Sequence, residues 1–281
     1  MLILIFENGR LGNQLFQYHG LRKYYPNEKI YFIGFKSLEK ICINKNIVFL
    51  NNHFFSLLLV RNFCNILFFL FAKFLIISTL SEQSSSFEFK LVKKNGIFKY
   101  ILLIDNLFFQ HKDAHPQLIT EIPIINLNTL SNLNFFKQKN NSKKEISVFV
   151  HIRRGDYMFW PSSDYPAAIS MNWYLNQMDY FRSRYSQIKF IVFTDDQSYI
   201  SKVFETTNDV IISFEDEIID FATMANCHHG ILSASTFSWW GAYLAKISNP
   251  SGEFIAPKYW IGYNKKEWFP LWIETNWLKY V

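Results

Sequence analysis

The segment at 151–157, His-Ile-Arg-Arg-Gly-Asp-Tyr, holds the residues of this chain that are best suited to chemistry. It continues a run of β-branched and aromatic residues that is typical of a buried strand. Along a strand, His151 and Arg153 share one face and Arg154 lies on the other. We expect one guanidinium to point into a crevice, where its fork matches phosphate oxygens, and the other to anchor the loop, with Asp156 as a candidate partner. The pattern alone fits a surface ion pair about as well.

An arginine fixed beside a diphosphate has a definite use in group transfer. When a sugar leaves a nucleotide diphosphate, the leaving group gains negative charge. A guanidinium stabilises that charge more in the transition state than in the ground state. Removal of such a group costs on the order of 10²–10³ in rate.

A second polar cluster runs from Ser233 to Ser238, where a short apolar run gives way to a helical pattern. Hydroxyls and backbone N–H groups at a helix N-terminus form an anion site. Plain N-capping by Ser235 or Thr236 is the simpler interpretation, and both roles are compatible. We expect Trp239 and Trp240 to pack the helix against a sheet rather than to stack on a ligand.

Asp195 and Asp196 follow another strand pattern. Their adjacent spacing, with no third acidic ligand close in sequence, argues against a metal site and favours helix capping or ribose binding. The histidines other than His151 form no metal-ligand spacing with cysteine or aspartate. We therefore expect no metal.

The elements that must position these clusters alternate between strand and helix. Strands are predicted at 31–35, near 100–105, and at 146–154, 189–193 and 230–235, and helices at 172–185, 216–226 and from 236. Alternation predicts an α/β protein with parallel sheets, whose ligands bind at the carboxyl ends of the strands. The polar run at 137–144 is typical of a linker, so we expect Rossmann-like domains at 1–143 and 144–281, with the last helix packing back on the first.

The N-terminus predicts a strand at 2–6, a glycine-containing loop at 7–12 and a helix after it, for which Asn13 is a plausible N-cap. Such a unit occurs in nucleotide-binding folds, although the loop is not Gly-x-Gly-x-x-Gly. The first residues do not form a signal peptide, because Glu7 interrupts a short apolar run. Three widely spaced cysteines predict neither a disulfide framework nor a metal site and favour a reducing compartment.

The net charge of +6 suits a phosphorylated substrate or an anionic membrane, and no motif indicates nucleic acid. Residues 54–80 are strongly apolar and approach the length of a membrane span, but Arg61, Asn62, Asn65 and Lys73 interrupt them. We favour core helices here, then a membrane-surface contact, and last a span.

Four segments together resemble bacterial α-1,2-fucosyltransferases of glycosyltransferase family 11. They are GRLGNQLFQY at 9–18, VHIRRGDY at 150–157, FTDD at 193–196 and STFSWWGAYLA at 235–245. The resemblance implies a GT-B fold with two Rossmann-like domains facing across a cleft, of which the N-terminal one is on the acceptor side. It implies a GDP-β-L-fucose donor, inversion to an α-linked fucose, usually on O2 of galactose, and no metal.

The resemblance also implies roles for individual residues. Arg153 or Arg154 would hold the pyrophosphate, His151 would lie beside the donor, and Asp220 would read the N1–H and N2–H₂ of guanine. The remaining expected site residues are donor-binding Asp195, Ser235, Thr236, Phe237 and Ser238, and a loop of Gly12, Asn13 and Gln14 that faces donor or acceptor.

The base that deprotonates the acceptor hydroxyl is an open choice. Asp156 is a candidate, but a salt bridge with the neighbouring Arg154 would lower its pKa and make it a poor base. Fucose lacks a 6-hydroxyl and is prone to an oxocarbenium-like path, which reduces the need for a strong base. Asp156 is therefore either catalytic or structural.

The sequence thus predicts an α-1,2-fucosyltransferase for a surface polysaccharide or O-antigen. Its acceptor would be a galactose-containing oligosaccharide or lipid-linked glycan, and it would act in the cytoplasm, peripherally on the inner face of the membrane through 54–80. One alternative keeps the fold with another GDP-sugar or linkage, and another is a non-catalytic glycan- or nucleotide-binding protein. Turnover of a panel of GDP-sugars separates them.

Overall fold

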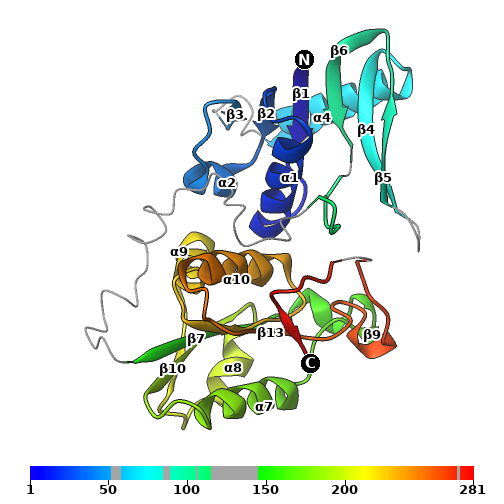
Figure 1. Ribbon diagram of the computed structural model, residues 1–281. Coiled ribbons are helices and arrows are strands. Elements are labelled where there is room, and N and C mark those ends of the chain that lie inside the picture. Colours follow the sequence, from blue (N-terminus) through cyan, green and yellow to red (C-terminus); the bar gives the residue numbers. More distant parts are fainter. Residues whose placement is uncertain (52–57, 85–88, 106, 115–144, 271–272) are drawn as a thin grey trace. The chain divides into compact units, whose positions relative to one another are not determined.

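The structure, a computed structural model, divides into two compact units (Figure 1). It describes residues 1–51, 58–84, 89–105, 107–114, 145–270 and 273–281. The described part of the first unit is 1–114, and that of the second is 145–281. The predicted linker at 137–144 lies outside the described residues.

The first unit is built on a six-stranded sheet in the order β3-β2-β1-β6-β4-β5. All neighbouring strands are parallel except β4 and β5, which form an antiparallel pair. The strands are β1 (Leu2–Phe6), β2 (Lys29–Ile33), β3 (Ile47–Leu50), β4 (Ile77–Ser84), β5 (Phe89–Lys94) and β6 (Phe98–Ile104).

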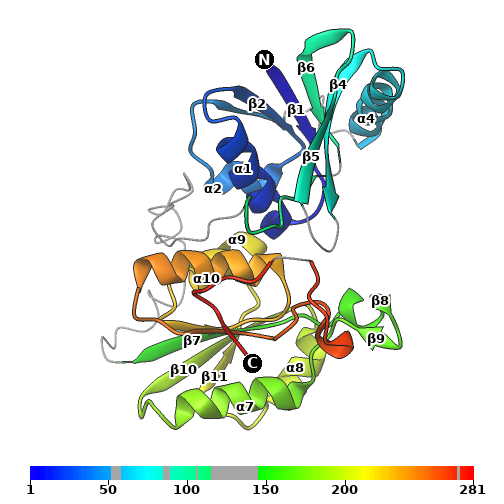
Figure 2. The same ribbon diagram turned by 45° about the vertical axis from the view of Figure 1, so that its right-hand side comes forward.

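Helices cover both faces of this sheet (Figure 2). Helices α1 (Leu11–Tyr24) and α2 (Lys36–Ile41) lie on one face, and α4 (Leu58–Lys73) lies on the other. The alternation of side chains along β2 explains this arrangement. Phe32 faces α1, where its ring contacts Tyr18, whereas Ile33 belongs to the cluster that α4 covers.

Within the apolar segment at 54–80, the described residues from 58 on form α4 and the beginning of β4, as the favoured interpretation predicted in part. Cys64, Phe68 and Phe71 pack against the sheet, and the ring of Phe68 lies 5.8 Å from that of Phe6. Among the described residues, no helix has both the length and the apolar character needed to cross a membrane.

The second unit holds a six-stranded, fully parallel sheet in the order β11-β10-β7-β12-β13-β14. Counted along the chain, this is the order 3-2-1-4-5-6 of a dinucleotide-binding fold, whose switch point lies between β7 and β12. Its strands are β7 (Ile146–Ile152), β10 (Ile188–Thr194), β11 (Val210–Ile212), β12 (His229–Ile231), β13 (Phe254–Ala256) and β14 (Lys279–Tyr280). A separate two-stranded sheet pairs β8 (Pro161–Ser162) with β9 (Tyr165–Pro166).

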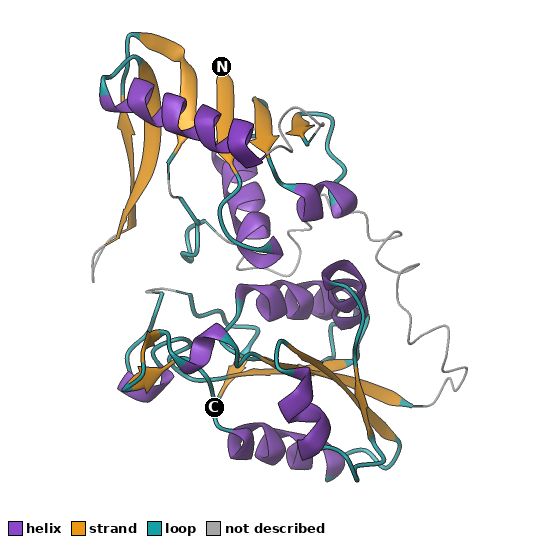
Figure 3. Ribbon diagram, turned by 180° about the vertical axis from the view of Figure 1, so that it is seen from behind, coloured by secondary structure: helices purple, strands orange, loops and turns teal. Residues whose placement is uncertain are grey.

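Helices again cover both faces of the sheet (Figure 3). On one side lie α7 (Met171–Arg182) and α8 (Gln197–Val203), and on the other lie α9 (Glu217–Met224) and α10 (Thr236–Ser248). Short 3-10 turns are present at η1 (Asp156–Met158) and η2 (Tyr263–Lys265).

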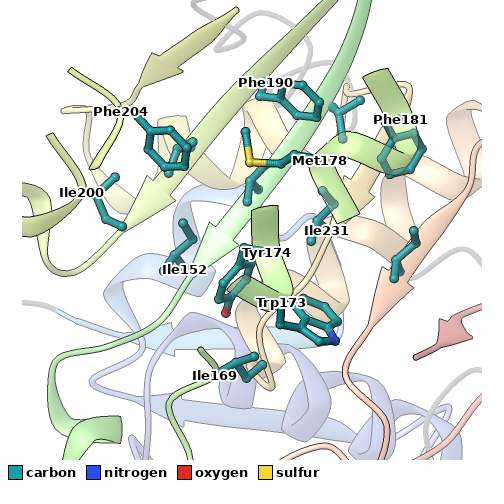
Figure 4. Packing of buried hydrophobic residues seen from close by; sticks show 14 residues of the cluster. Ile152, Ile169, Trp173, Tyr174, Met178, Phe181, Phe190, Ile200, Phe204 and Ile231 are labelled. Atoms are coloured by element: carbon teal, nitrogen blue, oxygen red, sulfur yellow. The ribbon is translucent and has the colours of Figure 1, made fainter. Parts of the chain in front are cut away.

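The core under α7 and α8 is continuous and aromatic (Figure 4). Tyr174 and Phe181 of α7 are fully buried against Ile152 of β7 and Phe190 of β10. This packing fixes the end of β7, from which the arginine segment emerges. On the other face Trp239 and Trp240 are also fully buried, in agreement with the packing role predicted for them.

One expectation was wrong in detail. Asn13 is not the N-cap of α1, because the helix begins at Leu11 and its cap residue is Arg10. Among the described residues, no α-helix follows α10 in the chain. It ends in β14, which adds to the edge of the second sheet. The α/β class with two parallel-rich sheets is confirmed.

Candidate functional site

The candidate site lies at the switch point of the second sheet. Strands β7 and β12 are neighbours there, with Val150 opposite Ile231. One residue beyond this pair, His151 turns its Nδ1 atom toward the hydroxyl of Ser233, at 2.6 Å. The carboxyl ends of the two strands are therefore joined by a side-chain hydrogen bond at the position where open α/β sheets bind ligands.

His151 is a neutral residue in this environment. Its side chain is buried, and burial together with the positive charge of Arg153 lowers its pKa to about 3. Its ring centroid lies 5.7 Å from that of Phe237, at the beginning of α10. A neutral imidazole offers one donor and one acceptor, so His151 can orient polar groups but supplies no positive charge to a phosphate.

Arg153 is the first residue after β7 and makes two ion pairs. Its Nη2 atom donates to Asp156 at 2.6 Å, and its Nε atom lies 3.1 Å from the carboxylate of Asp195. The side chain is only 14% exposed. Two carboxylates thus hold the guanidinium in one orientation, which is the preorganisation that an anion-binding arginine needs.

Arg154 has different partners, which belong to α8. Its guanidinium lies 3.8 Å from the centroid of the Tyr199 ring, and its Nε donates to Asp196 at 3.2 Å. Tyr199 and Asp196 belong to the beginning of α8, whose N-cap is Asp196. Arg154 therefore anchors the loop to α8, and the capping role anticipated for this acidic pair is confirmed for Asp196.

Asp195 connects both arginines. One carboxylate oxygen accepts the backbone N–H of Arg154 at 2.8 Å, while the other faces the guanidinium of Arg153. The same carboxylate packs against Gly155, where an added Cβ would lie only 2.7 Å from Oδ2. This contact explains why residue 155 is a glycine, since a side chain at this position would displace the carboxylate that orients Arg153.

The salt bridge expected between Asp156 and Arg154 is not formed. Asp156 pairs with Arg153 instead, because η1 begins at Asp156 and turns its side chain back toward the face of Arg153. The Asp156 side chain is 61% exposed. Its partner is thus the arginine whose charge helps to lower the pKa of His151.

The beginning of α10 forms the other wall of the site. Ser235 caps the helix through a hydrogen bond from the backbone N–H of Phe237, and Thr236 is the first helical residue. Ser238 is fully buried, and its hydroxyl donates to the carbonyls of Ser233 and Ser235. Ser238 therefore stabilises the turn itself.

Asp220 lies in the first turn of α9, next to α10. Its neighbour Phe221 contacts Phe237, with ring centroids 5.6 Å apart. The hydroxyl of Ser213 donates to the Asp220 carboxyl at 2.5 Å. Burial, reinforced by Glu215 and Asp216, raises the pKa of Asp220 to about 7, although Ser213 opposes the shift.

Gly12, Asn13 and Gln14, which were expected to form a loop, lie in the first unit. They belong to the first turn of α1 instead. The Gln14 amide donates to Glu7 and to the carbonyl of Gly9, which has a positive φ of 80°. Asn13 accepts from Gln110 at 2.9 Å. These side chains hold the turn between β1 and α1 in one conformation.

No group of three or more His, Cys, Asp or Glu side chains suited to a metal ion occurs within the described ranges. The two adjacent aspartates that could have suggested one are each paired with an arginine.

Sequence reasoning missed three contributors. The hydroxyl of Tyr157 donates to the carbonyl of Ala234 at 3.0 Å and so links the arginine loop to α10. Tyr199 stacks on Arg154, and Ser213 holds Asp220. Tyr157 stands inside the His-Ile-Arg-Arg-Gly-Asp-Tyr segment and could have been noticed there, whereas Tyr199 and Ser213 carry no local signal.

The second unit, with its arginine loop and helix N-terminus at the switch point of a parallel sheet, has the form of a nucleotide-binding domain. Residues 2–261 match the family model of glycosyl transferase family 11, and the chain belongs to that family. The expected family and enzyme class are thereby confirmed.

Relatives support this membership. An α-1,2-colitosyltransferase of Escherichia coli is 28% identical over 279 residues, covering 90% of each chain. The O-antigen biosynthesis glycosyltransferase WbnK of Escherichia coli is 26% identical, over 78% of this chain and 69% of that protein. Galactoside α-(1,2)-fucosyltransferase 2 of Pongo pygmaeus is 33% identical over 114 residues, which are 38% of this chain and 33% of that one.

Among solved structures, POFUT1 in complex with GDP superimposes with a TM-score of 0.55 at 12% identity, covering 90% of this chain and 97% of that one. The likeness concerns the fold, and it agrees with the two-sheet GT-B architecture expected from the sequence.

Proposed function

We propose that this enzyme transfers L-fucose from GDP-β-L-fucose to a galactoside hydroxyl, forming an α-1,2 linkage in surface-glycan biosynthesis. The observation that carries the proposal is the fixed guanidinium of Arg153 beside the His151–Ser233 pair at the switch point. Membership of glycosyl transferase family 11 and the names of the relatives support it.

Arg153 is proposed to hold the diphosphate. Its positive charge acts on His151, whose ring lies near Phe237, whereas Arg154 is stacked on Tyr199 of α8. The backbone at the beginning of α10 adds the partial positive charge of a helix N-terminus. Ser235, Thr236 and Phe237 are proposed to line the nucleotide pocket with Arg153, and Asp195 acts by holding the guanidinium in place.

Asp220 is proposed to read guanine. A carboxylate accepts hydrogen bonds from both N1–H and N2–H₂ of guanine, and adenine offers no such pair of donors. Its site next to α10 suits this role, because Phe221 and Phe237 connect the two helices. Ser213 keeps the carboxyl oriented before the nucleotide arrives.

In the reaction, the acceptor oxygen attacks the anomeric carbon while the bond from that carbon to the β-phosphate oxygen breaks. GDP leaves with the electron pair, and the acceptor proton is lost to a base or to water. Arg153 stabilises the charge that develops on the phosphate. Asp156 is proposed to orient Arg153, since its carboxylate is paired with that guanidinium at 2.6 Å. No residue requires a metal ion in this scheme.

A second donor is favoured by a specific observation. The relative that matches 90% of this chain is named a colitosyltransferase. Colitose is the 3-deoxy analogue of L-fucose, so the two donors differ by one hydroxyl. A site that hydrogen-bonds this hydroxyl rejects the deoxy sugar by ~10⁴-fold, while an apolar pocket separates them far less.

The deciding experiment measures kcat/KM for GDP-fucose and GDP-colitose with a series of β-galactoside acceptors, with and without EDTA. The proposal predicts a preference for GDP-fucose and α-1,2-linked product by linkage analysis. A preference for GDP-colitose would reassign the donor within the same mechanism. GDP binding without transfer or donor hydrolysis would favour a non-catalytic protein. The proposed acceptor in the cell is a lipid-linked, galactose-containing glycan, reached from the cytoplasm.

A further inference from the structure

The outer face of α4 is apolar although it is exposed. Phe63, Ile66 and Phe74 are 65%, 61% and 70% exposed. Phe69 and Leu70 are exposed as well, and the spacing of three and four residues places all of them on one side of the helix. The helix is therefore hydrophobic on both sides, which is unusual for a helix on the surface of a sheet.

The opposite side of α4 packs against the sheet. Cys64, Phe68, Phe71 and Ala72 pack on the cluster around Leu4 and Leu103. With 16 residues the helix is also shorter than a membrane span needs. An apolar helix that is fixed to a sheet on one side and too short to span can reach lipid only by lying in the plane of the interface.

The apolar surface continues past the end of α4 at Leu75, whose backbone conformation costs stability. Ile76 N–H donates to the carbonyl of Phe71 and Leu75 N–H to that of Ala72, so α4 ends in a Schellman motif with Leu75 at C′. Leu75 has a φ of 54°, in the region where glycine is favoured and a branched aliphatic side chain costs ~1 kcal/mol. It is nevertheless 49% exposed, so little burial compensates for the strain.

The exposed apolar surface continues onto the β5–β6 turn. The backbone N–H of Ile97 donates to the carbonyl of Leu75 at 2.8 Å, which holds the turn against the end of α4. Ile97 is 76% exposed. Gly96 allows this approach, because an added Cβ would lie 2.3 Å from the backbone of Ile77. We call the following set the apolar patch: Phe63, Ile66, Phe69, Leu70, Phe74, Leu75 and Ile97.

The segment that carries the apolar patch has a positive net charge. Between residues 58 and 105 the sequence has six Lys and Arg and three Asp and Glu. Lys73 at the end of α4 and Lys99 beside the β5–β6 turn are exposed. The acidic Glu82 is turned inward, where it accepts the backbone N–H groups of Phe108 and Phe109. Lysines beside exposed aromatic and aliphatic side chains complement anionic lipid headgroups.

We propose that the apolar patch inserts into the headgroup–acyl boundary of an anionic membrane and holds the protein on its surface. The inference rests on the described first unit and is independent of the donor assignment. It assigns the contact to the outer face of α4 and the adjoining turn rather than to residues 54–80 as a whole.

The test is flotation of the full chain with vesicles of phosphatidylcholine mixed with phosphatidylglycerol, and with vesicles of phosphatidylcholine alone. Wild type is expected to float with the anionic vesicles. The variant Phe63→Ser with Ile66→Asn and Leu70→Gln should lower the partition coefficient by ~100-fold or more, because three exposed apolar side chains are lost. Lys73→Gln with Lys99→Gln should weaken binding to anionic vesicles by roughly 5-fold per lysine and leave neutral vesicles unaffected.

Two further variants separate binding from folding. Leu75→Gly should weaken vesicle binding while the thermal unfolding midpoint stays the same or rises, because the strained conformation suits glycine. A purely structural role for Leu75 would lower the midpoint instead. Ile43→Asn is the matched control, because Ile43 is 55% exposed and lies outside the apolar patch. It should leave flotation unchanged.

Several outcomes would overturn the proposal. Wild type could remain in the buffer fraction with both vesicle types, or the triple variant could float like wild type. Lipid-free sedimentation could also show a dimer that the triple variant dissociates, which would make the apolar patch an interface between copies. If the triple variant does not unfold cooperatively, vesicle binding is compared between wild type and two single variants, Leu75→Gly and Phe63→Ser. Turnover of a water-soluble acceptor should be unaffected in all folded variants.

Discussion

His151 in β7 and Ser233, two residues after the end of β12, make a side-chain hydrogen bond of 2.6 Å at the point where the strand order reverses. The contact links the arginine loop, which follows β7, to the segment that begins α10. Tyr157 makes a second link between the same two segments through the carbonyl of Ala234. Both walls of the proposed nucleotide pocket are therefore positioned by direct hydrogen bonds.

Loss of this link should weaken donor binding more than stability. We expect Ser233→Ala and His151→Ala each to raise the Kd for GDP, with a coupling of ~1 kcal/mol in the double variant, because the partners contact each other directly. Calorimetric titration of the four proteins measures the coupling. Ser251→Ala, in an exposed turn, is the control. Additive effects would mean that the two residues act separately.

The two arginines should respond differently to substitution. Arg153→Ala is expected to reduce kcat by on the order of 10²–10³ with little change in the unfolding midpoint, and Arg153→Lys to recover little, since lysine lacks the fork. Arg154→Ala should instead lower stability by ~1 kcal/mol, because it removes the stacking on Tyr199. Single-turnover rates and thermal melts of both variants decide this. If Arg154→Ala abolishes chemistry in a stable protein, the assignment of the two residues must be exchanged.

Asp220 should make nucleotide binding pH-dependent. Its pKa of about 7 in the free protein means that a proton must leave before the carboxylate can accept both guanine donors. GDP affinity is therefore expected to increase as the pH rises through 7 and to level off above it. Asp220→Asn should remove this dependence and the preference for GDP over ADP. Titration of both nucleotides between pH 5.5 and 8.5, roughly one and a half units on either side of that pKa, provides the measurement.

The same shift has a consequence for stability. Because the folded pKa lies above the unfolded value of ~3.9, the folded state holds the proton more tightly, and stability falls as the pH rises from about 4 to about 7. Asp220→Asn should then raise the unfolding midpoint of the ligand-free protein at pH 8 and leave it nearly unchanged at pH ~4. An equal change in the unfolding midpoint at both pH values would show that ionisation of Asp220 is not the cause.

Asp156 is expected to position Arg153 rather than to take the acceptor proton. Asp156→Asn keeps a hydrogen-bond acceptor for the guanidinium, so we expect it to retain more activity than Asp156→Ala, with the acidic limb of the pH–rate profile in place for both. If Asp156 is the general base, Asn and Ala should be equally inactive and that limb should disappear. Profiles of kcat/KM against pH distinguish the two roles.

Metal removal should have no effect on turnover. Arg153 neutralises the leaving diphosphate in the proposed scheme, and Asp195 and Asp196 are paired with arginines. Activity after dialysis against EDTA should equal that in added Mg²⁺ or Mn²⁺. A loss on dialysis that is restored by one of these ions would contradict the scheme.

Local patterns predicted the elements of the second unit well, because its strands are buried runs such as Ile188–Thr194 and its helices carry clear caps such as Ser235. The different partners of Arg153 and Arg154 agree with the divergence expected from strand alternation. The ion-pair partner of Asp156 was not predicted, because it depends on how η1 turns after Gly155. Ser213 and Tyr199 were not predicted, since they reach Asp220 and Arg154 through tertiary packing. In the first unit, Phe32 of β2 faces α1, whereas Phe68 of α4 packs on the opposite face of the same sheet. Both stand in apolar runs, so the local sequence does not show which face each one covers.

The carboxylate of Asp195 is tied to three consecutive residues: it pairs with the side chain of Arg153, accepts the backbone N–H of Arg154 and fills the space where a Cβ of residue 155 would lie. A longer or shorter side chain at this position would shift all three together. The proposed diphosphate side of the pocket is therefore constrained against changes at single positions. New donor specificity would have to arise from residues that contact the sugar, while these four positions remain fixed as one unit.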